Sequence, residues 1–583
     1  MRDEEVGVLV VGGGPVGLTA AMLLKRLGVD VLAINKGFRT SDRPKAHMLN
    51  QRSMEIFTEL GLAEAIYVHS APPDRMATAA WYAGFAGPDP DHGRLIGKIP
   101  AWGEGYRDPD YVAASPCRTA NLPQLRLEPL LHQRAVELVG ADRIRFGHEL
   151  LSLEQDADQV TALVRDLRSG AEFAVRARYL VAADGGRTVG RSLGIGMTGT
   201  GDLARVTTVH FTADLSPWAP DDDAIIHYLV NPAFGRSVDG GVLQPVGPRR
   251  WGPDSEEWSI SFGLRDGESY DEASVVPRLR AMLGLPDLDL QVQVVSTWTI
   301  AGAVADRFAA GRVFLAGDAA HRNPPTGGLG MNTGIGDAYN LAWKLAQVLD
   351  GRSAADLLNS YESERRAVAE DVVRAALANA TAVFELDAVL GLSPELSEAE
   401  NWQRIKQVWR ESPETLALRT AVEDALMQQT ADFRDHNLEV GLSYAAEQCD
   451  SPDPVRIFRP STVPGSPLPH APLTRLGRHC SVRDLVAGGR WVLIIGARGA
   501  AWRTAASALR SSLTPAVVHI EHAHGDWLDV RCAWTKARGV SAAGAVLVRP
   551  DRYVAWRWDE VPTDPVAALA DALTTTGHAR STL

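Results

Sequence analysis

The chain has 583 residues, 45% hydrophobic and 22% charged, with a net charge of −13 at neutral pH. This composition is globular and excludes a disordered, collagen-like or disulfide-rich chain, while the acidic balance disfavours a nucleic-acid binder. The four cysteines stand singly, no apolar run reaches the ~20 residues that span a bilayer and no secretion signal is recognisable, so we expect a reduced, soluble, cytoplasmic protein without a membrane or nucleic-acid partner.

The first forty residues predict a βαβ unit. An apolar run at residues 6–11 is followed by a glycine cluster, a helical stretch at 16–27 and a second apolar run at 29–34. Doubly wound α/β sheets begin in this way.

The glycine cluster satisfies the dinucleotide-binding pattern G-x-G-x-x-G directly after a strand and before a helix. In that pattern Gly12 permits a tight turn, Gly14 lets the backbone approach a pyrophosphate, and Gly17 packs the helix on the strand. Pro15 and Val16 begin the helix, whose free N–H groups attract an anion. The alternative is a glycine turn that serves packing only.

A dinucleotide-binding unit normally carries an acidic residue about twenty positions further on, for the ribose hydroxyls. This sequence has Asn35 there, followed by Lys36. An amide still hydrogen-bonds a hydroxyl, but it lacks the charge-assisted strength of a carboxylate. The sequence therefore predicts a weaker ribose contact than is usual.

Helical patterns follow at residues 50–67 and 124–139, and a β-rich segment at 151–182 runs into Asp184. Strands and turns dominate from 207 to 300, which predicts an antiparallel sheet inserted into the first fold. Asp221, Asp222 and Asp223 within it are interpreted as a solvated loop, and no metal site is expected, because three successive carboxylates point different ways.

Two further motifs place an aspartate after a strand. Asp184 precedes two glycines, and Asp318 precedes a glycine-rich turn at residues 327–334 that opens a long helix. A carboxylate there accepts hydrogen bonds from a polyol, and free loop amides face a ring carbonyl. Taken alone, each aspartate is more readily a helix cap or a turn former. Their combination with the first motif favours a cofactor site.

With these three motifs in order, the sequence resembles the FAD-dependent aromatic hydroxylases, the single-component flavoprotein monooxygenases of the p-hydroxybenzoate hydroxylase fold. The resemblance is nearest to the phenol and chlorophenol hydroxylase branch, and residues 34–62, 122–131 and 317–345 carry it. It implies FAD as the cofactor, NAD(P)H and O₂ as co-substrates, and an aromatic small molecule as the substrate. A homodimer is also compatible with it.

The resemblance implies an α/β fold with a doubly wound FAD-binding domain of glutathione-reductase type, an inserted antiparallel substrate sheet and a C-terminal thioredoxin-like domain. The expected boundaries are 1–75, 116–195 and 301–350 for the FAD-binding domain, 76–115 and 196–300 for the substrate sheet, 351–445 for a helical segment, 446–470 for a linker and 471–583 for the thioredoxin-like domain. Residues 495–502 stand where such a domain carries Cys-x-x-Cys, and they contain no cysteine, so no disulfide exchange is expected. Cys480 and Cys532 are interpreted as buried thiols.

The resemblance also implies the residues that contact FAD. They are Gly12, Gly14, Pro15, Val16, Gly17, Asn35, Lys36, Lys45, Gln124, Asp184, Asp318, Pro325, Gly330, Met331 and Asn332. Asp184 lies in a motif credited with contacts to both FAD and NAD(P)H, which agrees with the single G-x-G-x-x-G pattern. Two departures from the family are Lys45, where arginine is usual, and Thr188, where serine is usual.

The implied reaction is hydroxylation of a phenol through a flavin C4a-hydroperoxide, and a polycyclic polyketide of an antibiotic pathway is favoured over a simple phenol. A base beside the ring makes a phenol more nucleophilic. His47, which stands where related enzymes carry an acidic base, is the candidate; a structural histidine is an equal alternative. Tyr228 and Trp298 are candidates to face the ring, with a core position as the alternative. Baeyer–Villiger oxidation, epoxidation, quinone reduction and a non-catalytic flavin-binding regulator remain open.

Overall fold

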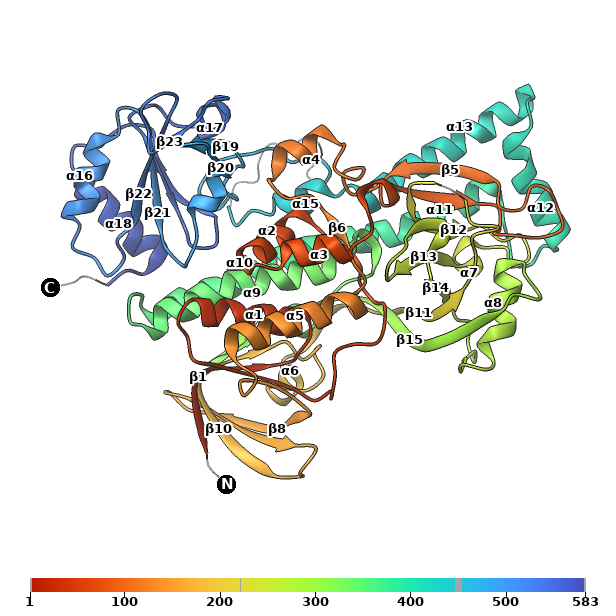
Figure 1. The fold of residues 1–583 in the computed structure, drawn as a ribbon, viewed down its shortest axis with the longest axis horizontal. Coiled ribbons are helices and arrows are strands. Elements are labelled where there is room, and N and C mark those ends of the chain that lie inside the picture. The colour runs from red at the N-terminus through yellow and green to blue at the C-terminus, as the bar shows by residue number, and fades with distance from the viewer. Residues whose placement is uncertain (1–2, 221, 446–452, 454, 581–583) are drawn as a thin grey trace.

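The structure, a computed structural model, describes residues 3–220, 222–445, 453 and 455–580 (Figure 1). These residues form three large sheets and a small ribbon of β3 (Met48–Leu49) and β6 (Ala120–Asn121). Each large sheet lies in a lobe of its own. The first is at the centre and bottom of the view, the second at the right and the third at the upper left.

The first sheet has the order β16-β17-β10-β1-β2-β7, and β8 and β9 extend it from β10. Its central strands are parallel and almost completely buried, as expected for apolar strands covered on both faces. The strands are β1 (Glu4–Val11), β2 (Val31–Asn35), β7 (Ile144–Phe146), β8 (His148–Gln155), β9 (Val160–Asp166), β10 (Glu172–Ala182), β16 (Ala309–Ala310) and β17 (Val313–Leu315).

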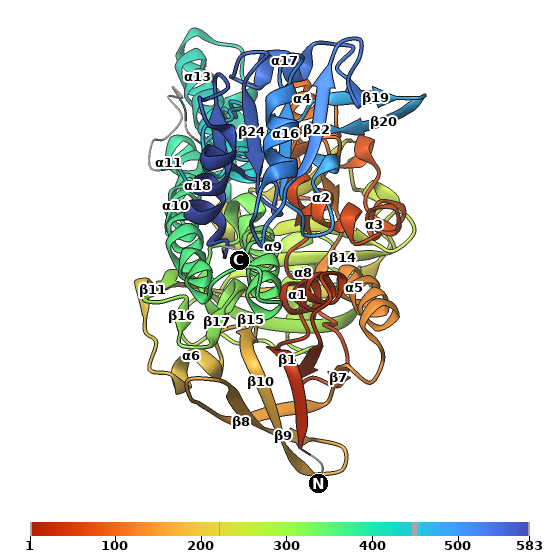
Figure 2. The same ribbon diagram turned by 90° about the vertical axis from the view of Figure 1, so that its left-hand side faces the viewer.

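Three helices lie side by side over the first sheet, as Figures 1 and 2 show. They are α1 (Pro15–Arg26), α5 (Gln124–Val139) and α9 (Leu329–Leu349). Their apolar faces join the strands in one core that also includes α2 (Gln51–Glu59) and α10 (Asn359–Ala382). This packing makes the first lobe an α/β unit in which helices cover a mainly parallel sheet.

The second sheet has the order β18-β15-β11-β14-β13-β12-β4-β5 and is antiparallel except where β12 meets β4. The long strands β11 and β15 join it to the first lobe, and β15 crosses the predicted boundary at residue 300 without a break. The strands are β4 (Thr78–Tyr82), β5 (Leu95–Pro100), β11 (Met197–Ala213), β12 (Ala224–Leu229), β13 (Val242–Gly247), β14 (Glu257–Gly263), β15 (Leu290–Ala305) and β18 (His321–Arg322).

Helices cover the second sheet from both sides. On one face α8 (Val275–Leu283) packs on Val209, Phe211 and Ile260. Over β4 and β5 lie α11 (Glu385–Leu390), α12 (Glu398–Lys406) and α13 (Pro413–Gln428), which contribute Leu386 and Leu426 to a second core. The expected helical segment at 351–445 is thus divided, because α10 belongs to the first lobe and the later helices cover the second sheet. Shorter helices are α3 (Ala63–His69), α4 (Pro109–Ala114), α6 (Val189–Ser192), α7 (Ser237–Gly240), α14 (Thr430–Phe433) and α15 (His436–Val440).

The third sheet has the order β20-β19-β23-β22-β21-β24-β25. β21 is parallel to β22 and antiparallel to β24, which is antiparallel to β25. The elements are β19 (Pro472–Arg475), β20 (Arg478–Ser481), β21 (Val492–Ile495), α16 (Ala500–Ala508), β22 (Ala516–Glu521), β23 (Trp527–Leu528), α17 (Ala533–Ala537), β24 (Ala545–Val548), β25 (Val554–Trp558) and α18 (Pro565–Gly577). Cys480 and Cys532 are half-buried rather than buried as predicted, since β20 is an edge strand and Cys532 lies in a turn.

Part of the predicted linker belongs to the third lobe. Leu468 is fully buried in its core, and the amides of Gly465 and Leu468 donate to the carbonyls of Val554 and Arg552 at 2.8 Å each. The prolines that predict a linker here lie in a segment fixed by backbone pairing and one apolar side chain. We call the third sheet, its helices and residues 461–470 the terminal lobe. Residues 446–452 and 454, and with them Cys449, lie outside the described residues.

The aspartates predicted to form a solvated loop are held by the second sheet instead. Asp222 accepts a hydrogen bond from Tyr82, and Asp223 pairs with Lys98 at 2.5 Å, because strands β4 and β5 bring these partners alongside. Asp221 lies outside the described residues.

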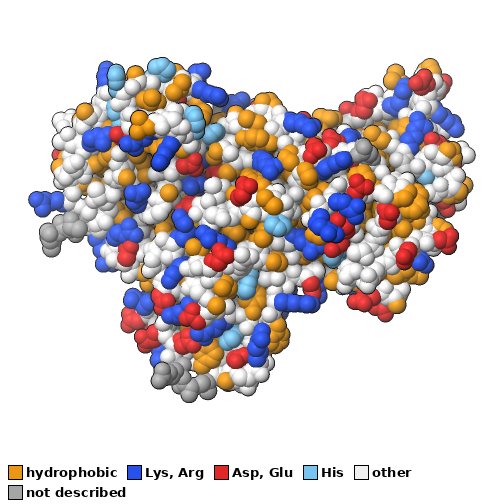
Figure 3. Space-filling view, in the orientation of Figure 1, with side chains coloured by type: hydrophobic (Ala, Val, Ile, Leu, Met, Phe, Trp, Pro, Cys, Tyr) orange, Lys and Arg blue, Asp and Glu red, His pale blue; other side chains and the backbone are white. Residues whose placement is uncertain are grey.

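Charges of both signs are mixed over the molecular face in Figure 3, where Lys and Arg alternate with Asp and Glu. Among the described residues, no group of three or more His, Cys, Asp and Glu side chains is placed to hold a metal ion. No helix in the described part of the chain is long and apolar enough to cross a membrane.

Candidate active site

Three loops start side by side at one edge of the first sheet. The register pairs Val11 of β1 with Ala182 of β10, and Ala182 with Leu315 of β17. The glycine motif follows Val11, Asp184 follows Ala182 and Asp318 follows Leu315. Ligands of open parallel sheets bind at this carboxyl edge, so the structure brings the three sequence motifs together where a dinucleotide is expected.

The glycines of the first loop serve different structural purposes. Gly12 has φ +125°, and a Cβ there would lie 2.1 Å from the carbonyl oxygen of Ala183; a Cβ on Gly17 would lie 2.0 Å from the oxygen of Gly12. A Cβ on Gly14 would meet nothing within 4 Å. Gly12 and Gly17 therefore allow close packing, while Gly14 faces open space that a phosphate can approach.

The helix after this loop presents a free N-terminus. α1 begins at Pro15 and Val16, its N-cap Gly14 offers no side-chain cap, and its first turn has no acidic residue. The unpaired amides and the helix dipole leave a positive end beside the open space at Gly14.

Asn35 ends β2 and supports the loop. Its Oδ1 accepts a hydrogen bond from the amide of Gly13 at 3.2 Å. Its neighbour Lys36 is exposed and pairs with Glu149 at 2.7 Å. The side chain predicted to bind a ribose is thus partly engaged in holding the phosphate loop.

Gln124 begins α5 and clamps the segment that leads to His47. Its amide donates to the carbonyl of Ala46 at 2.8 Å, and its side chain donates to Glu128. The other oxygen of Glu128 accepts from the amide of Ser41 at 2.6 Å. Lys45, within this segment, is exposed and has a left-handed backbone with φ +41°.

Asp184 caps its own turn. Its carboxylate accepts hydrogen bonds from the amides of Thr188 at 2.7 Å, Val189 at 3.0 Å and Gly186 at 3.1 Å. These contacts are those of a turn former, and they fix the second loop at the sheet edge.

Asp318 is exposed although residues 313–317 and 319–321 around it are all buried. The structure gives its carboxylate no hydrogen bond within the described residues, so both oxygens are free for a ligand at the sheet edge. A polyol such as a ribityl chain is a suitable partner.

A buried ionic cluster, which no sequence motif predicted, fixes the turn at Asp318. Asp337 of α9 accepts from the amide of Gly317 at 3.0 Å, binds His321 at 2.9 Å and pairs with Arg365 at 2.7 Å. Burial by itself raises the pKa of Asp337, but Arg365 and His321 together hold it below the usual value. An acidic residue at an otherwise apolar helix position was the available signal.

Glycines let the loops meet closely. A Cβ on Gly317 would lie 2.9 Å from Val16 Cγ2, and a Cβ on Gly334 would lie 2.6 Å from the same atom. A Cβ on Gly186 would lie 3.0 Å from the carbonyl oxygen of Asp318. The starts of α1 and α9 and the Asp184 turn therefore share one small region.

The N-terminus of α9 completes the edge. It follows Pro325 and two glycines of positive φ, no side chain caps it, and Gly330 and Met331 lie in its first turn. The amides of a first turn have no partner within the helix. They form a second set of free donors close to the first.

Asn332 ties α9 to the segment that carries His47. Its Oδ1 accepts from the amide of Asn50 at 3.0 Å, and its Nδ2 donates to the carbonyl of Met48 at 3.0 Å. The side chain is therefore engaged with the protein, and its backbone is what remains for a ligand.

His47 lies just before β3. Its Nδ1 is 3.1 Å from Asn121 Oδ1, and its ring meets the edge of Trp102 at 5.8 Å between centroids. Burial lowers the pKa of His47 to about 4, against the effect of the Asn121 hydrogen bond. The imidazole is therefore neutral at physiological pH.

Tyr228 and Trp298 share one face of the second sheet but do not meet. The strand order puts four strand spacings between them, roughly 19 Å. Tyr228 stacks on Trp81 at 4.7 Å and meets the edge of Phe433 at 6.4 Å. Trp298 donates to the hydroxyl of Thr208 at 3.0 Å. Trp81, Trp102 and Phe433 were not predicted, because nothing in their sequence neighbourhood distinguishes them from core residues.

Asp432 links this aromatic cluster to the start of α9. Its Oδ1 accepts a hydrogen bond from the amide of Gly327, and the residue is buried. Burial raises the pKa of Asp432 to about 7, although the Gly327 amide opposes the shift. The same carboxylate adds to the effect of burial in raising the pKa of Tyr228.

The residues at this edge fit FAD. The open approach at Gly14, two uncapped helix N-termini and the free carboxylate of Asp318 match a pyrophosphate, a ring system and a polyol. Residues 5–376 match the family model described as "FAD binding domain", and residues 461–577 match "Aromatic-ring hydroxylase, C-terminal". The chain belongs to the FAD-binding aromatic-ring hydroxylase family. It is a flavin-dependent aromatic monooxygenase.

Relatives of known activity match almost the whole chain. The 2,4-dichlorophenol 6-monooxygenase of Cupriavidus pinatubonensis is 35% identical, covering 98% of this chain and 96% of the relative. The tetracenomycin B2 monooxygenase-dioxygenase of Streptomyces olivaceus is 36% identical, covering 98% and 99%. The crystal structure of the flavin-dependent monooxygenase PieE in complex with FAD and substrate superposes with a TM-score of 0.91 at 36% identity, covering 99% of this chain and all of the other.

Proposed function

We propose that the protein hydroxylates a phenolic ring of a polycyclic, polyketide-type substrate, with NAD(P)H as the reductant and O₂ as the oxygen donor. Both phenol and polyketide monooxygenases are among its relatives, so family membership alone leaves the substrate class open. The observation that favours a polycyclic substrate is the width of one face of the second sheet.

That face is polar between two aromatic residues, and its polar side chains are buried or half-buried. It lies between Tyr228 and Trp298 and carries Thr208, His210, Gln244, Ser259 and Ser261. Arg126 of α5 reaches Glu257 on it at 2.5 Å, which turns the face toward the first lobe. Hydroxyl and amide groups spread over roughly 19 Å suit a flat substrate with several oxygen atoms better than a single ring.

The residues at the sheet edge have distinct tasks in this proposal. The α1 N-terminus and Gly14 hold the pyrophosphate, Asp318 holds the ribityl chain, and the amides of Gly330 and Met331 face the isoalloxazine. Bound FAD supplies the redox chemistry, accepting electrons from NAD(P)H and activating O₂. The protein orients the phenol and excludes water from it.

His47 acts in this proposal as the acceptor for the substrate hydroxyl. Its neutral imidazole faces Asn121 Oδ1 with Nδ1, and Nε2 has no hydrogen-bond partner in the described part of the chain. A hydrogen bond accepted from the phenol draws the proton away and raises the nucleophilicity of the ring. A base with a pKa of about 4 shares a phenol proton rather than removing it completely.

We also propose a thioredoxin-like fold for the terminal lobe. The strand order β22-β21-β24-β25, with β21-α16-β22 parallel and β24-β25-α18 after it, supports this assignment. The turn between β21 and α16 contains no cysteine, which argues against disulfide exchange. A homodimer stays a prediction.

The test is turnover with ¹⁸O₂. The FAD-loaded enzyme is given NADPH or NADH with a polycyclic phenol or with phenol itself, and the product mass is measured. We expect one ¹⁸O atom in a ring hydroxyl and a higher kcat/KM for the polycyclic phenol. A lactone or ester product indicates Baeyer–Villiger oxidation, an epoxide indicates epoxidation, and an unlabelled hydroquinone indicates quinone reduction. Absence of NAD(P)H oxidation with either phenol contradicts the proposed reductant and substrate class.

A further inference from the structure

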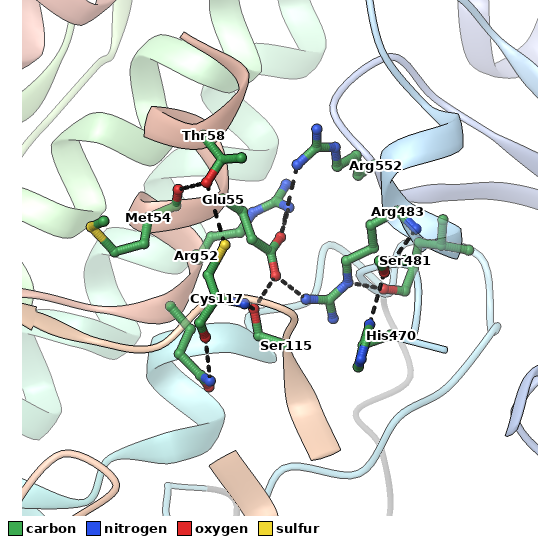
Figure 4. A network of polar contacts seen from close by, with 12 residues as sticks. Arg52, Met54, Glu55, Thr58, Ser115, Cys117, His470, Ser481, Arg483 and Arg552 are labelled. Atoms are coloured by element: carbon green, nitrogen blue, oxygen red, sulfur yellow. Dashed lines mark hydrogen bonds and ion pairs between the residues drawn. The ribbon is translucent and has the colours of Figure 1, made fainter. Parts of the chain in front are cut away.

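Helix α2 carries a buried carboxylate that pairs with an arginine of the terminal lobe (Figure 4). Glu55 is 2% exposed, and its Oε1 accepts hydrogen bonds from the hydroxyl of Ser115 at 2.6 Å and from Arg483 Nη1. Arg483 is itself buried, and its Nε donates to the carbonyl of Leu468 at 2.6 Å. A buried ion pair thus joins the first lobe to the terminal lobe.

Two more contacts with the terminal lobe lie on the same face of α2. Arg52 pairs with Glu55 at 3.2 Å and also donates to the carbonyl of Asp551 at 2.6 Å. Arg552 pairs with Glu59 at 3.2 Å. Residues 52, 55 and 59 follow helical spacing, so the terminal lobe holds α2 along its length.

The charges of this network depend on one another. Burial by itself raises the pKa of Glu55, but Arg483, Arg52 and Arg552 lower it to about 2. The carboxylate is therefore ionised, and removal of one arginine leaves a buried charge without full compensation.

Helix α2 is hydrogen-bonded to the start of α9, at the carboxyl edge of the first sheet where FAD is proposed to bind. Its N-cap Asn50 accepts a hydrogen bond from the amide of Ser53 at 2.9 Å, while the Asn50 amide donates to Asn332 Oδ1 at 3.0 Å. His47 lies three residues before this cap. A shift of α2 must move the His47 segment, the Asn332 contact or both.

The terminal lobe also closes a small cavity at the same place. The cavity has a volume of about 40 Å³, and its wall includes Asn50, Asn332, Asp551 and Tyr553. Glu439, also in the wall, has a buried Oε2 that makes no hydrogen bond within the described residues. A polar cavity of this size with an unpaired acceptor accommodates ordered water.

We propose that the terminal lobe is a positioning element of the monooxygenase site. Arg483 and Arg552 fix α2 through Glu55 and Glu59, and α2 in turn fixes the segment from His47 to Asn50 against Asn332. Asp551 and Tyr553 close the cavity behind that segment. The inference rests on the proposed placement of Asn332 beside the flavin. A loosened α2 admits water to the site, so we expect less hydroxylated product for each NAD(P)H consumed.

The test compares Arg483→Met with a matched contact elsewhere between the lobes. Trp491→Phe removes the hydrogen bond from Trp491 Nε1 to Gln347 Oε1, 3.3 Å, near the other end of α9. Hydrogen–deuterium exchange of residues 46–56 is measured in the FAD-loaded proteins, together with hydroxylated product formed per NAD(P)H. We expect R483M to exchange roughly tenfold faster in this segment and to lose coupling, while W491F keeps wild-type values.

A double variant separates positioning from general damage. In Glu55→Gln with Arg483→Met, the buried carboxylate and its counter-charge are removed together, but the contact that fixes α2 is still absent. We therefore expect exchange to stay faster and coupling to stay lower than in the wild type, and a return of both to wild-type values overturns the proposal. If R483M does not fold, Arg483→Lys retains the charge without the planar fork and takes its place.

Unchanged exchange in folded R483M, or an equal increase in W491F, overturns the proposal. The exchange result stands even if the wild-type protein hydroxylates none of the tested phenols, so failure of the proposed function is recognised separately.

Discussion

At the scale of single residues, His47 is neutral over the whole working pH range because burial lowers its pKa to about 4. We expect His47→Ala to reduce kcat/KM for hydroxylation by about 10²-fold, since a positioned proton acceptor contributes roughly that much. The loss should be the same from pH 6 to 9, because His47 does not titrate there. Initial rates across this range measure it, and His69→Ala, an exposed histidine, is the control. If His47→Ala has the hydroxylation rate and pH profile of the wild type, His47 is not the proton acceptor.

The raised pKa of Asp432 leads to a prediction about the pH dependence of the free energy of unfolding. Burial raises its pKa from 3.8 to about 7, so the folded state binds a proton that the unfolded state releases. Its contribution is complete below pH 4 and is lost as the pH rises through 7. The Asp432→Asn variant has no ionisable group at this position and does not lose this stability. The difference in free energy of unfolding, variant minus wild type, should therefore increase by about 3 kcal/mol between pH 5 and pH 8. Urea unfolding at these two pH values measures the difference; a pH-independent difference contradicts the prediction.

Residues of the site differ in how far a sequence reveals them. Gly14 and Asp318 stand in short motifs whose spacing fixes their surroundings, so their place at the sheet edge was predictable. Asp432 meets Gly327 across 105 residues of chain. That contact depends on the path of helices between them, which local pattern does not encode.

At the scale of elements, two glycines at the start of α1 have different roles, one in binding FAD and one in packing. A Cβ at Gly14 meets nothing within 4 Å and its φ of −82° suits alanine, whereas a Cβ at Gly17 lies 2.0 Å from the Gly12 oxygen. We expect Gly14→Ala to leave the Tm of the apoprotein unchanged and to weaken FAD binding at least about tenfold, because the methyl group blocks a pyrophosphate. Gly17→Ala should lower the apoprotein Tm.

FAD titration by fluorescence, with a thermal melt of each apoprotein, separates the two effects. Wild-type FAD affinity in Gly14→Ala would place the pyrophosphate elsewhere.

Element types were predicted well where apolar periodicity was strong, as in the βαβ start and the long α9. The linker shows the limit. Its prolines predict an irregular chain, which is correct for residues 455–470, but the packing of this part depends on Leu468 and on backbone pairing with residues 552 and 554. Tertiary contacts of an irregular segment leave no periodic signal.

At the scale of the whole molecule, the first lobe and the terminal lobe are joined by buried charges as well as by apolar surface. Glu55 pairs with Arg483 of the terminal lobe, and Glu364 of α10 pairs with Arg549 of the same lobe. Burial opposes ionisation of both carboxylates, but the arginines hold the pKa of each below its usual value. Docking of the terminal lobe is therefore linked to pH.

The sign of this linkage follows from the lowered pKa values. A carboxylate with a depressed pKa contributes stability above its unfolded pKa of 4.5 and loses it as the pH falls through its folded value, about 2 for Glu55. For Glu55 this difference in pKa corresponds to about 3 kcal/mol as an upper bound. We expect the terminal lobe to separate from the first lobe as the pH falls from 4.5 to 2, before the first sheet unfolds.

Limited proteolysis by pepsin between pH 4.5 and 2, with cleavage products identified by mass, measures this separation. Glu55→Gln, which has no charge to neutralise, should show a weaker pH dependence of cleavage near residues 461–470. Trp491→Phe serves as the control, because it weakens the same interface without removing an ionisable group. If all three proteins are cleaved with the same pH dependence, the buried pair at Glu55 does not set the acid limit of docking.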